Sequence, residues 1–322
     1  MLIATIPPYV RHRDEIAKYN QVGALRFNTI MPISQSRFDV LYDLKKSAGD
    51  KPLWIDLKCR QLRITGFSYL PYSFIEISHK ISVDLPAKVL FKDCEAEIVD
   101  IVDGNKLILS GRPTRVVGAG EPINIPSPTL KIEGFLTESD VEYLEVAKKL
   151  ELNRFMLSFT QQESDLTEVL KIYPEAELMA KIEDPKGVLF ASEASESLFS
   201  GGLRLMAARD DLYINTGGDI FRALREILAK DRSAVCASRV LTSLEKQDQV
   251  SLQDLSDIRY MIFLGYKNFM LSDGLCFSRD SFRKAMGVWG SCWSLLQEGY
   301  TWNPPFPEYI PTHFELVKED KP

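Results

Sequence analysis

The chain has 322 residues, 45% of them hydrophobic and 26% charged, which is typical of one large globular domain or two ordinary ones. Its net charge of −6 and its scattered basic residues argue against a nucleic-acid partner or an anionic membrane surface. Five cysteines without a CxxC pair, no apolar run of about 18 residues and no basic signal segment at residues 1–6 lead us to expect a cytoplasmic protein without a zinc ribbon or membrane span.

The first part of the chain alternates short apolar segments with amphipathic ones. Strands are expected at residues 2–6, 25–28 and 52–57, and helices at residues 11–22 and 34–47. In the second of these helices, Phe38, Leu41 and Leu44 fall on one stripe, as they do on a helix that packs against a sheet. The pattern indicates two complete strand–helix units and a third strand.

The rhythm changes between residues 67 and 133, where apolar and polar residues alternate as they do in β-strands. Strands are expected at residues 73–83, 88–90, 95–102 and 106–109. The turn Asp103-Gly104-Asn105 is typical of a hairpin between the last two. Glycine and proline mark loops at residues 118–122 and 126–128. The sequence therefore predicts a small all-β insertion after the third strand.

Strands and helices alternate again from residue 134 to residue 300. The expected strands are 154–158, 177–182, 202–207, 234–237 and 268–271, and the expected helices are 138–150, 163–173, 188–198, 219–230, 252–264 and 279–297. Together with residues 1–66 these units predict a parallel (β/α)₈ TIM barrel. A doubly wound sheet is disfavoured because Pro7-Pro8-Tyr9, not a glycine-rich turn, follows the first strand. Residues 301–322 are rich in proline and predict an extended tail.

Polar side chains follow the expected strands at their carboxyl ends, where barrels of this kind hold their functional groups. Residues two apart on a strand share a face, so polar pairs at three strand ends are each expected to point the same way. These pairs are Arg26 with Asn28, Asp56 with Lys58, and Lys181 with Glu183. We expect them to converge with Arg209 and Asp211 after the sixth strand and with Ser238 at the end of the seventh.

Two interpretations of this charged cluster are open from the residues alone. Glu183 and Asp211 beside Lys181 and Arg209 have the composition of a divalent-metal site with a catalytic cation, suited to an anionic substrate. The same charges could equally form a network of ion pairs that closes the edge of the sheet, because charges at the ends of buried strands are costly to leave unpaired.

Taken in order, the polar segments resemble motifs of the pyruvate kinase family, and the resemblance runs through nearly the whole barrel. The segments that carry it are Arg26-Phe27-Asn28-Thr29, Asp56-Leu57-Lys58-Cys59-Arg60-Gln61-Leu62-Arg63, Leu136-Thr137-Glu138-Ser139-Asp140, Ser158-Phe159-Thr160, Lys181-Ile182-Glu183-Asp184-Pro185-Lys186-Gly187, Met206-Ala207-Ala208-Arg209-Asp210-Asp211-Leu212 and Ala237-Ser238-Arg239-Val240-Leu241-Thr242-Ser243-Leu244. The resemblance implies a glycolytic phosphotransferase, a small-molecule substrate of the phosphoenolpyruvate or pyruvate type, and a homo-oligomer.

The resemblance also implies roles for the residues of the metal and substrate end. Glu183 and Asp211 would bind Mg²⁺ or Mn²⁺ as hard oxygen ligands. Lys181 would stabilise the transferring phosphoryl group or the enolate of pyruvate, and Arg26 would reach the phosphate. Ser238 stands in place of a threonine near the methyl carbon of pyruvate and keeps its hydroxyl.

Further roles are implied for a monovalent cation and for the nucleotide. Asn28 and Asp56 would belong to a K⁺ site. Arg63 would contact nucleotide phosphates, and Lys58 and Arg209 would add positive charge for the substrate or the nucleotide.

Several segments depart from the family's pattern. Ile30-Met31-Pro32 stands in place of Ser-His-Gly and Leu57 in place of a threonine, which removes groups of the K⁺ site and a nucleotide contact. Asp210 replaces a glycine whose N–H would receive the substrate carboxylate, and Asp273-Gly274-Leu275 stands in place of Gly-Glu-Thr. The insertion is shorter than the family's lid domain, and we expect no C-terminal effector domain. The metal and enolate end is therefore expected to be intact, and the nucleotide end damaged.

Three functions follow from these matches and departures. The first is the metal-dependent phosphotransferase of the family. The second is a metal-dependent lyase, aldolase or decarboxylase that acts on a 2-oxo acid and needs no nucleotide. The third is a non-catalytic paralogue with a binding or regulatory role, because a fold does not determine a function.

Overall fold

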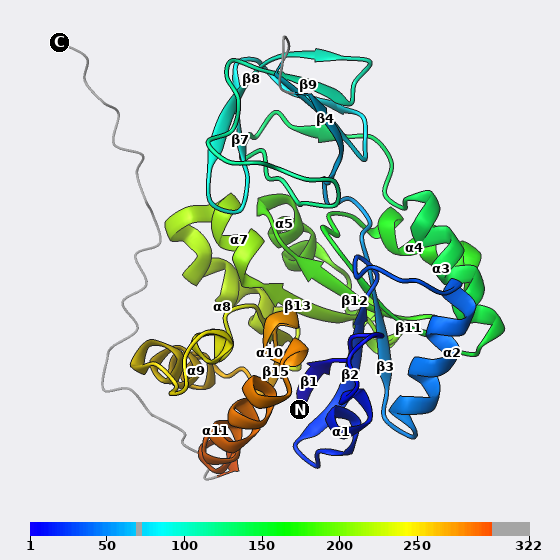
Figure 1. The fold of residues 1–322 in the computed structure, drawn as a ribbon, viewed down its shortest axis with the longest axis vertical. Coiled ribbons are helices and arrows are strands. Elements are labelled where there is room, and N and C mark those ends of the chain that lie inside the picture. The colour runs from blue at the N-terminus through cyan, green and yellow to red at the C-terminus, as the bar shows by residue number, and fades with distance from the viewer. Residues whose placement is uncertain (69–72, 298–322) are drawn as a thin grey trace.

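A closed barrel of eight parallel strands forms the centre of the computed structural model, which describes residues 1–68 and 73–297 (Figure 1). In their order around the barrel, the strands are β1 (Leu2–Thr5), β15 (Asn268–Met270), β14 (Val235–Ala237), β13 (Arg204–Ala208), β12 (Glu177–Ile182), β11 (Arg154–Leu157), β3 (Leu53–Leu57) and β2 (Val22–Asn28). The (β/α)₈ barrel predicted from the alternating pattern is thus confirmed.

Helices cover the outside of this barrel (Figure 1). They are α1 (Arg13–Lys18), α2 (Arg37–Ala48), α3 (Glu138–Lys149), α4 (Glu163–Ile172), α5 (Pro185–Glu193), α6 (Glu196–Ser200), α7 (Arg209–Thr216), α8 (Ile220–Lys230), α9 (Leu252–Leu264), α10 (Asp273–Phe277) and α11 (Arg279–Gln297), with short 3₁₀ turns η1 (Gly217–Asp219) and η2 (Thr242–Glu245). Side-chain caps fix several of their starts. Ser36 accepts a hydrogen bond from the N–H of Asp39 at the start of α2, for example.

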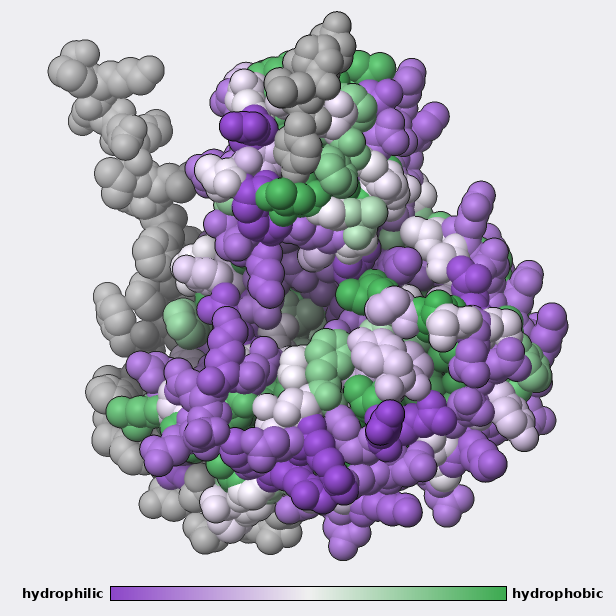
Figure 2. All heavy atoms as spheres, in the orientation of Figure 1, coloured by the Kyte–Doolittle hydropathy of each residue, from purple (hydrophilic) through white to green (hydrophobic). Residues whose placement is uncertain are grey.

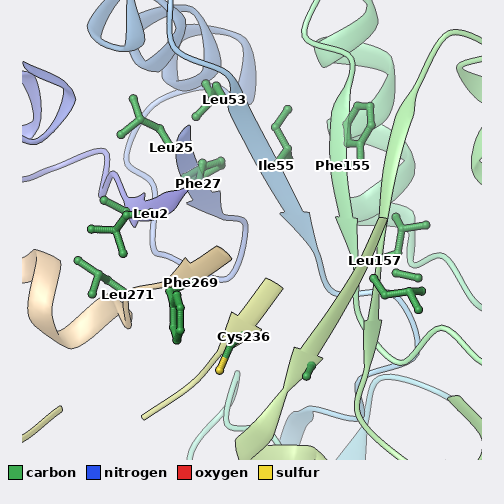
Figure 3. Close-up of a cluster of buried hydrophobic side chains, with 14 of the residues drawn as sticks. Leu2, Leu25, Phe27, Leu53, Ile55, Phe155, Leu157, Cys236, Phe269 and Leu271 are labelled. Atoms are coloured by element: carbon green, nitrogen blue, oxygen red, sulfur yellow. The ribbon is translucent and has the colours of Figure 1, made fainter. Parts of the chain in front are cut away.

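Two apolar layers lie on the two sides of the barrel wall, because successive strand residues point to opposite faces. Ile55 of β3 packs outward with helix residues such as Leu41, and Figure 3 shows part of this outer cluster. Trp54, the neighbour of Ile55, belongs instead to an inner cluster inside the barrel. The other members of the inner cluster are Ile3, Ala24, Met156, Met179, Met206, Val235, Ala237 and Met270.

Between β3 and α3 the chain leaves the barrel and forms two small sheets above it (Figure 1). The larger sheet is antiparallel, in the order β4 (Ile64–Ser68), β5 (Phe74–Ile77), β9 (Lys106–Leu109), β8 (Glu95–Val102) and β7 (Ala87–Leu90), and the smaller one pairs β10 (Lys131–Ile132) with β6 (Ile81–Ser82). We call residues 64–132 the insertion. Its apolar cluster, which includes Ile75, Val89 and Leu107, is separate from both clusters of the barrel.

The structure differs from the expected elements in several places. The expected strand 73–83 is divided into β5 and β6, the expected helix 188–198 is replaced by α5 and α6, and the short helix α10 was not expected. The first helix ends at Lys18 rather than at residue 22, because Val22 pairs with Leu2 and begins β2. The helix α7 was not predicted: it starts directly after β13, and its N-cap residue Ala208 has no side chain that could signal a helix start. Residues two apart on a helix diverge by about 200°, so Arg209 and Asp211 point in different directions.

The predicted tail at residues 301–322 lies outside the described residues. Within residues 1–68 and 73–297, no helix is long and apolar enough to cross a membrane.

Candidate functional site

A cavity of about 550 Å³ lies at the carboxyl ends of the barrel strands, below the insertion. Six basic and six acidic side chains line it, so the cavity is charged without favouring one sign. Figure 2 shows the molecule hollowed between the insertion and the barrel, with hydrophilic residues around the hollow. Nine of the ten site residues predicted from the sequence line the cavity. They are Arg26, Asn28, Asp56, Lys58, Arg63, Lys181, Glu183, Asp211 and Ser238.

The strand period explains why most of these residues meet. On β3, Asp56 follows the inner residue Trp54 by two positions, and on β12 Lys181 follows the inner residue Met179 by two. The polar residues therefore continue the inward-facing rows above the apolar layer of the barrel. At the carboxyl ends of the strands, where these inward-facing rows border the cavity, the residues are polar instead of apolar.

Lys181 lies at the centre of the site. Its Nζ is 3.4 Å from Asp56 Oδ1 and 3.2 Å from Glu183 Oε1, and it donates a hydrogen bond of 2.8 Å to Ser158 Oγ. Burial by itself would lower the pKa of Lys181, but the negative charges of Asp56 and Glu183 outweigh burial and raise it. The side chain therefore stays an ammonium group at neutral pH.

Asp56 lies between two cations. Arg26 donates to Asp56 Oδ2 from Nε and Nη2, at 2.7 and 2.6 Å, while Lys181 faces the other oxygen. Burial would raise the pKa of Asp56, but Lys181 and Arg26 outweigh it and hold the pKa below its usual value. A K⁺ ion at Asp56, which the resemblance implied, would have to share the carboxylate with both cations.

Asp273 is a site residue whose role the sequence did not reveal. Its Oδ1 accepts hydrogen bonds from Arg26 Nη1 and, at 3.1 Å, from Thr5 Oγ1. Its Oδ2 accepts a hydrogen bond of 2.7 Å from Asn28 Nδ2. Burial would lower the pKa of Arg26, but the charges of Asp273 and Asp56 raise it. The guanidinium is thus held between two carboxylates.

Glu183 is buried and has one oxygen fixed by the main chain. The N–H of Phe159 donates to Glu183 Oε2 at 2.7 Å, from a backbone with φ of 51°, a region that residues other than glycine rarely adopt. Burial and the nearby charge of Asp211 raise the pKa of Glu183 to about 7, although Lys181 acts against this shift. Burial and Asp211 therefore outweigh the ammonium of Lys181 at this carboxyl group.

Asp211, at the start of α7, contacts the insertion. Asn124 Nδ2 donates to Asp211 Oδ1 at 2.9 Å, and Gln61 Nε2 lies 3.5 Å from Oδ2. Burial raises the pKa of Asp211, and the hydrogen bond from Asn124 offsets part of the shift. Asn215, one turn further along α7, holds Asn124 in place by donating to its Oδ1 at 3.1 Å. Asn124, a residue of the insertion, therefore forms a direct hydrogen bond with Asp211 of the barrel.

Arg209 does not lie in the cavity, so the expected convergence was wrong for this residue. Its guanidinium forms an ion pair with Asp257 of α9 at 2.6 Å and donates to the carbonyl groups of Ala237 and Ser238, at 3.1 and 2.5 Å. The reason is the unpredicted helix α7, which turns Arg209 away from Asp211. Arg209 instead anchors the loop after β14.

Arg63, Lys58 and Ser238 also line the cavity, and each has a different environment. Arg63 donates to the carbonyl of Gly120 at 2.6 Å and to the side chain of Gln61, so much of its guanidinium is engaged within the protein. Lys58 is half-buried at the rim, where burial lowers the pKa of its amine. Ser238 has a φ of 66°, a strained conformation that presents the loop after β14 to the cavity.

The acidic pair, Glu183 and Asp211, fits a divalent cation of the magnesium type. Within residues 1–68 and 73–297, no group of three His, Cys, Asp or Glu side chains could hold a metal ion by itself. Mg²⁺ commonly uses one or two carboxylates and takes its remaining ligands from water and substrate oxygens. The buried carboxylate of Glu183 and the half-buried carboxylate of Asp211 both line the cavity and are of the kind that Mg²⁺ uses.

The fold and the site define a (β/α)₈ barrel protein with a charged cavity at the carboxyl ends of its strands. The model of the pyruvate kinase barrel domain matches residues 68–276, more than half of the chain, and the chain belongs to the pyruvate kinase family.

The chain is similar to two pyruvate kinases of known name. A pyruvate kinase of Borreliella burgdorferi is 21% identical over 304 residues, covering 84% of this chain and 63% of the relative. A pyruvate kinase of Corynebacterium efficiens is 24% identical over 203 residues, covering 60% of this chain and 42% of the relative. The chain spans less than two thirds of the length of either relative.

Proposed function

We propose that the cavity binds a divalent cation together with a 2-oxo acid of the pyruvate type and stabilises its enolate. The observation that carries this proposal is the buried ammonium group of Lys181, 3.2 Å from Glu183, in a cavity that also receives Asp211. When a proton leaves C3 of pyruvate, its electron pair moves to the carbonyl oxygen. A fixed ammonium stabilises that developing charge without having to reorganise.

Glu183 and Asp211 are the residues that would hold Mg²⁺ or Mn²⁺. A divalent cation supplies positive charge to the carboxylate and carbonyl oxygens of the substrate. Phe159 fixes one oxygen of Glu183 and Asn124 one oxygen of Asp211. The second oxygens lie 3.2 Å from Lys181 and 3.5 Å from Gln61, and a cation would bind them beside these groups. The hydroxyl of Ser238 belongs to the same cavity and is our candidate for the group beside C3.

Membership of the family supports phosphoryl transfer as the complete reaction. In that reaction the P–O bond of phosphoenolpyruvate breaks, a new P–O bond forms to a nucleotide oxygen, and the enolate that is left takes a proton at C3. Arg26 and Lys181 would face the phosphoryl group, and Arg63 the nucleotide. Arg63 would first have to release Gly120 and Gln61.

A reaction of a 2-oxo acid without a nucleotide is the second candidate. The observation that favours it is the pairing of Arg26 with both Asp56 and Asp273, which leaves the guanidinium little freedom to bind a phosphate. A lyase, aldolase or decarboxylase would use the same enolate stabilisation and would need no phosphate site.

Exchange of the methyl protons of pyruvate for deuterium tests the step that both candidates share. We expect exchange in D₂O with Mg²⁺, followed by NMR, and no exchange in EDTA. Formation of pyruvate from phosphoenolpyruvate and ADP, with K⁺ present, tests phosphoryl transfer, and release of CO₂ or pyruvate from 2-oxo acids tests the second candidate. Absence of both Mn²⁺ binding and exchange would contradict the proposal and favour a non-catalytic paralogue.

A further inference from the structure

Three donors of the barrel meet at the carboxylate of Asp273. Its carboxylate accepts from the guanidinium of Arg26, from Thr5 Oγ1 at 3.1 Å and from Asn28 Nδ2 at 2.7 Å. A guanidinium, a hydroxyl and an amide that converge on one point are donors that hold a carboxylate or a phosphate. Here the protein supplies the anion itself, from the start of α10.

The guanidinium of Arg26 has no nitrogen free of protein contacts. Nε and Nη2 face Asp56 at 2.7 and 2.6 Å, and Nη1 donates to Asp273 and, at 3.1 Å, to Thr5. Arg26 is only 7% exposed, so its guanidinium cannot turn toward solvent to find another partner. A phosphate can therefore bind Arg26 fully only by displacing Asp273.

The segment that carries Asp273 is itself held in place. Ser272 Oγ, next to Asp273, donates to Glu245 Oε1 at 2.5 Å, and His12 Nε2 lies 3.0 Å from the carbonyl oxygen of Cys276. These contacts fix α10 on both sides. Displacing Asp273 would thus disturb the packing of α10 as well as the ion pair with Arg26.

We propose that Asp273 fills the phosphate position of this cavity and restricts its substrate to unphosphorylated 2-oxo acids. The inference rests on the proposed binding of a 2-oxo acid and a divalent cation in the cavity. It names the substrate class, and it favours the reaction without a nucleotide over phosphoryl transfer. Equal numbers of acidic and basic side chains line the cavity, so the cavity has no excess positive charge for a phosphate. A 2-oxo acid brings a single carboxylate, which a divalent cation can neutralise.

Calorimetric titrations of the wild-type protein with Mg²⁺ provide the first test. Phosphoenolpyruvate should bind no more tightly than pyruvate, although it carries more negative charge. Asp273→Ala should raise the affinity for phosphoenolpyruvate relative to pyruvate by about tenfold or more, because a charge-assisted hydrogen-bond site becomes free. Adding Arg26→Gln to Asp273→Ala should abolish this gain. Asp273→Asn, which keeps the shape of the side chain, provides a second variant if Asp273→Ala unfolds.

Asp280→Asn is the matched control, because it removes an equally charged, largely exposed side chain that pairs with Lys284 outside the cavity. The affinity of this variant for phosphoenolpyruvate relative to pyruvate should equal that of the wild type. Tighter binding of phosphoenolpyruvate than of pyruvate by the wild type would overturn the inference, as would an unchanged ratio in both Asp273 variants. Inorganic phosphate titrated without metal separates the two proposals: binding to Asp273→Ala but not to the wild type supports the role of Asp273 even where no metal binds.

Discussion

Lys181 shows at the scale of one residue how a buried charge can be both stable and chemically useful. Its ammonium group has two carboxylates within 3.4 Å, which compensate for the loss of water around it. A substrate oxyanion entering the cavity would share the ammonium with these carboxylates and with Ser158 rather than replace solvent. The cost of desolvating the ammonium is therefore met during folding, before any ligand arrives.

Replacing this ammonium should remove the proposed chemistry. We expect Lys181→Met to slow the exchange of pyruvate methyl protons about a hundredfold or more, because one preorganised stabiliser of the oxyanion is lost. The melting temperature should also fall, since Asp56 and Glu183 lose a shared cation. Lys186→Met is the control, because Lys186 is exposed, lies outside the cavity lining and donates to the carbonyl of Leu130. Exchange at the wild-type rate in Lys181→Met would refute the role given to Lys181.

The acidic pair allows a second prediction at this scale. Glu183→Gln and Asp211→Asn should each weaken the binding of Mn²⁺, measured by calorimetry, by more than about tenfold. Asp219→Asn removes an equally charged but exposed side chain near the end of α7 and should leave Mn²⁺ binding unchanged. Wild-type affinity in both Glu183→Gln and Asp211→Asn would place the metal elsewhere or nowhere.

At the scale of elements, the sequence predicted the barrel because its strands read as short apolar segments with polar ends. The period of two also placed Arg26, Asp56 and Lys181 in one cavity. The strand period gave a wrong position for Arg209, because this residue belongs to α7 and nothing in the sequence before α7 marks a helix start. Asp273 and Asn124 could not be predicted as partners of Arg26 and Asp211, since their contacts join segments 247 and 87 residues apart.

The loops after β3 and β11 are joined by a buried ion pair. Arg60 donates to Asp165 at 2.6 and 2.7 Å and to the carbonyl of Phe159 at 2.9 Å, while Asp165 also accepts from the N–H of Gln161 at the start of α4. The side chains of Arg60 and Asp165 are 6% and 2% exposed. This pair therefore fixes the turn whose N–H holds Glu183.

Breaking that ion pair should be costly. We expect Arg60→Met to lower the free energy of unfolding, measured with urea, by about 3–5 kcal/mol, because Asp165 would remain buried without its cation. Arg222→Met is the matched control: Arg222 pairs with Glu226 on the surface of α8, with its side chain 76% exposed. Its loss should cost no more than about 0.5 kcal/mol. Equal effects of the two substitutions would mean that the buried pair does not hold the loops together.

At the scale of the whole molecule, the site is shared between two separately packed parts. The barrel and the insertion have distinct apolar clusters, yet Asn124 of the insertion bonds Asp211 of the barrel at 2.9 Å. Arg63 and Gly120 make a second polar contact near the same boundary. Polar contacts exchange for water more readily than apolar packing does, so the position of the insertion should respond to charge at Asp211.

Asn124→Asp tests this coupling. Without metal, a second carboxylate at hydrogen-bond distance from Asp211 should repel it by about 1 kcal/mol or more and lower the melting temperature in EDTA. With Mn²⁺ or Mg²⁺ the added carboxylate should become a ligand, so the increase in melting temperature on adding metal should exceed that of the wild type. Asn105→Asp, in the distant turn between β8 and β9, adds the same charge and should show neither effect. A metal-induced increase no larger than that of the wild type would show that the cation does not bind at Asp211, and would leave Asn124 with the structural task of holding the insertion on the barrel.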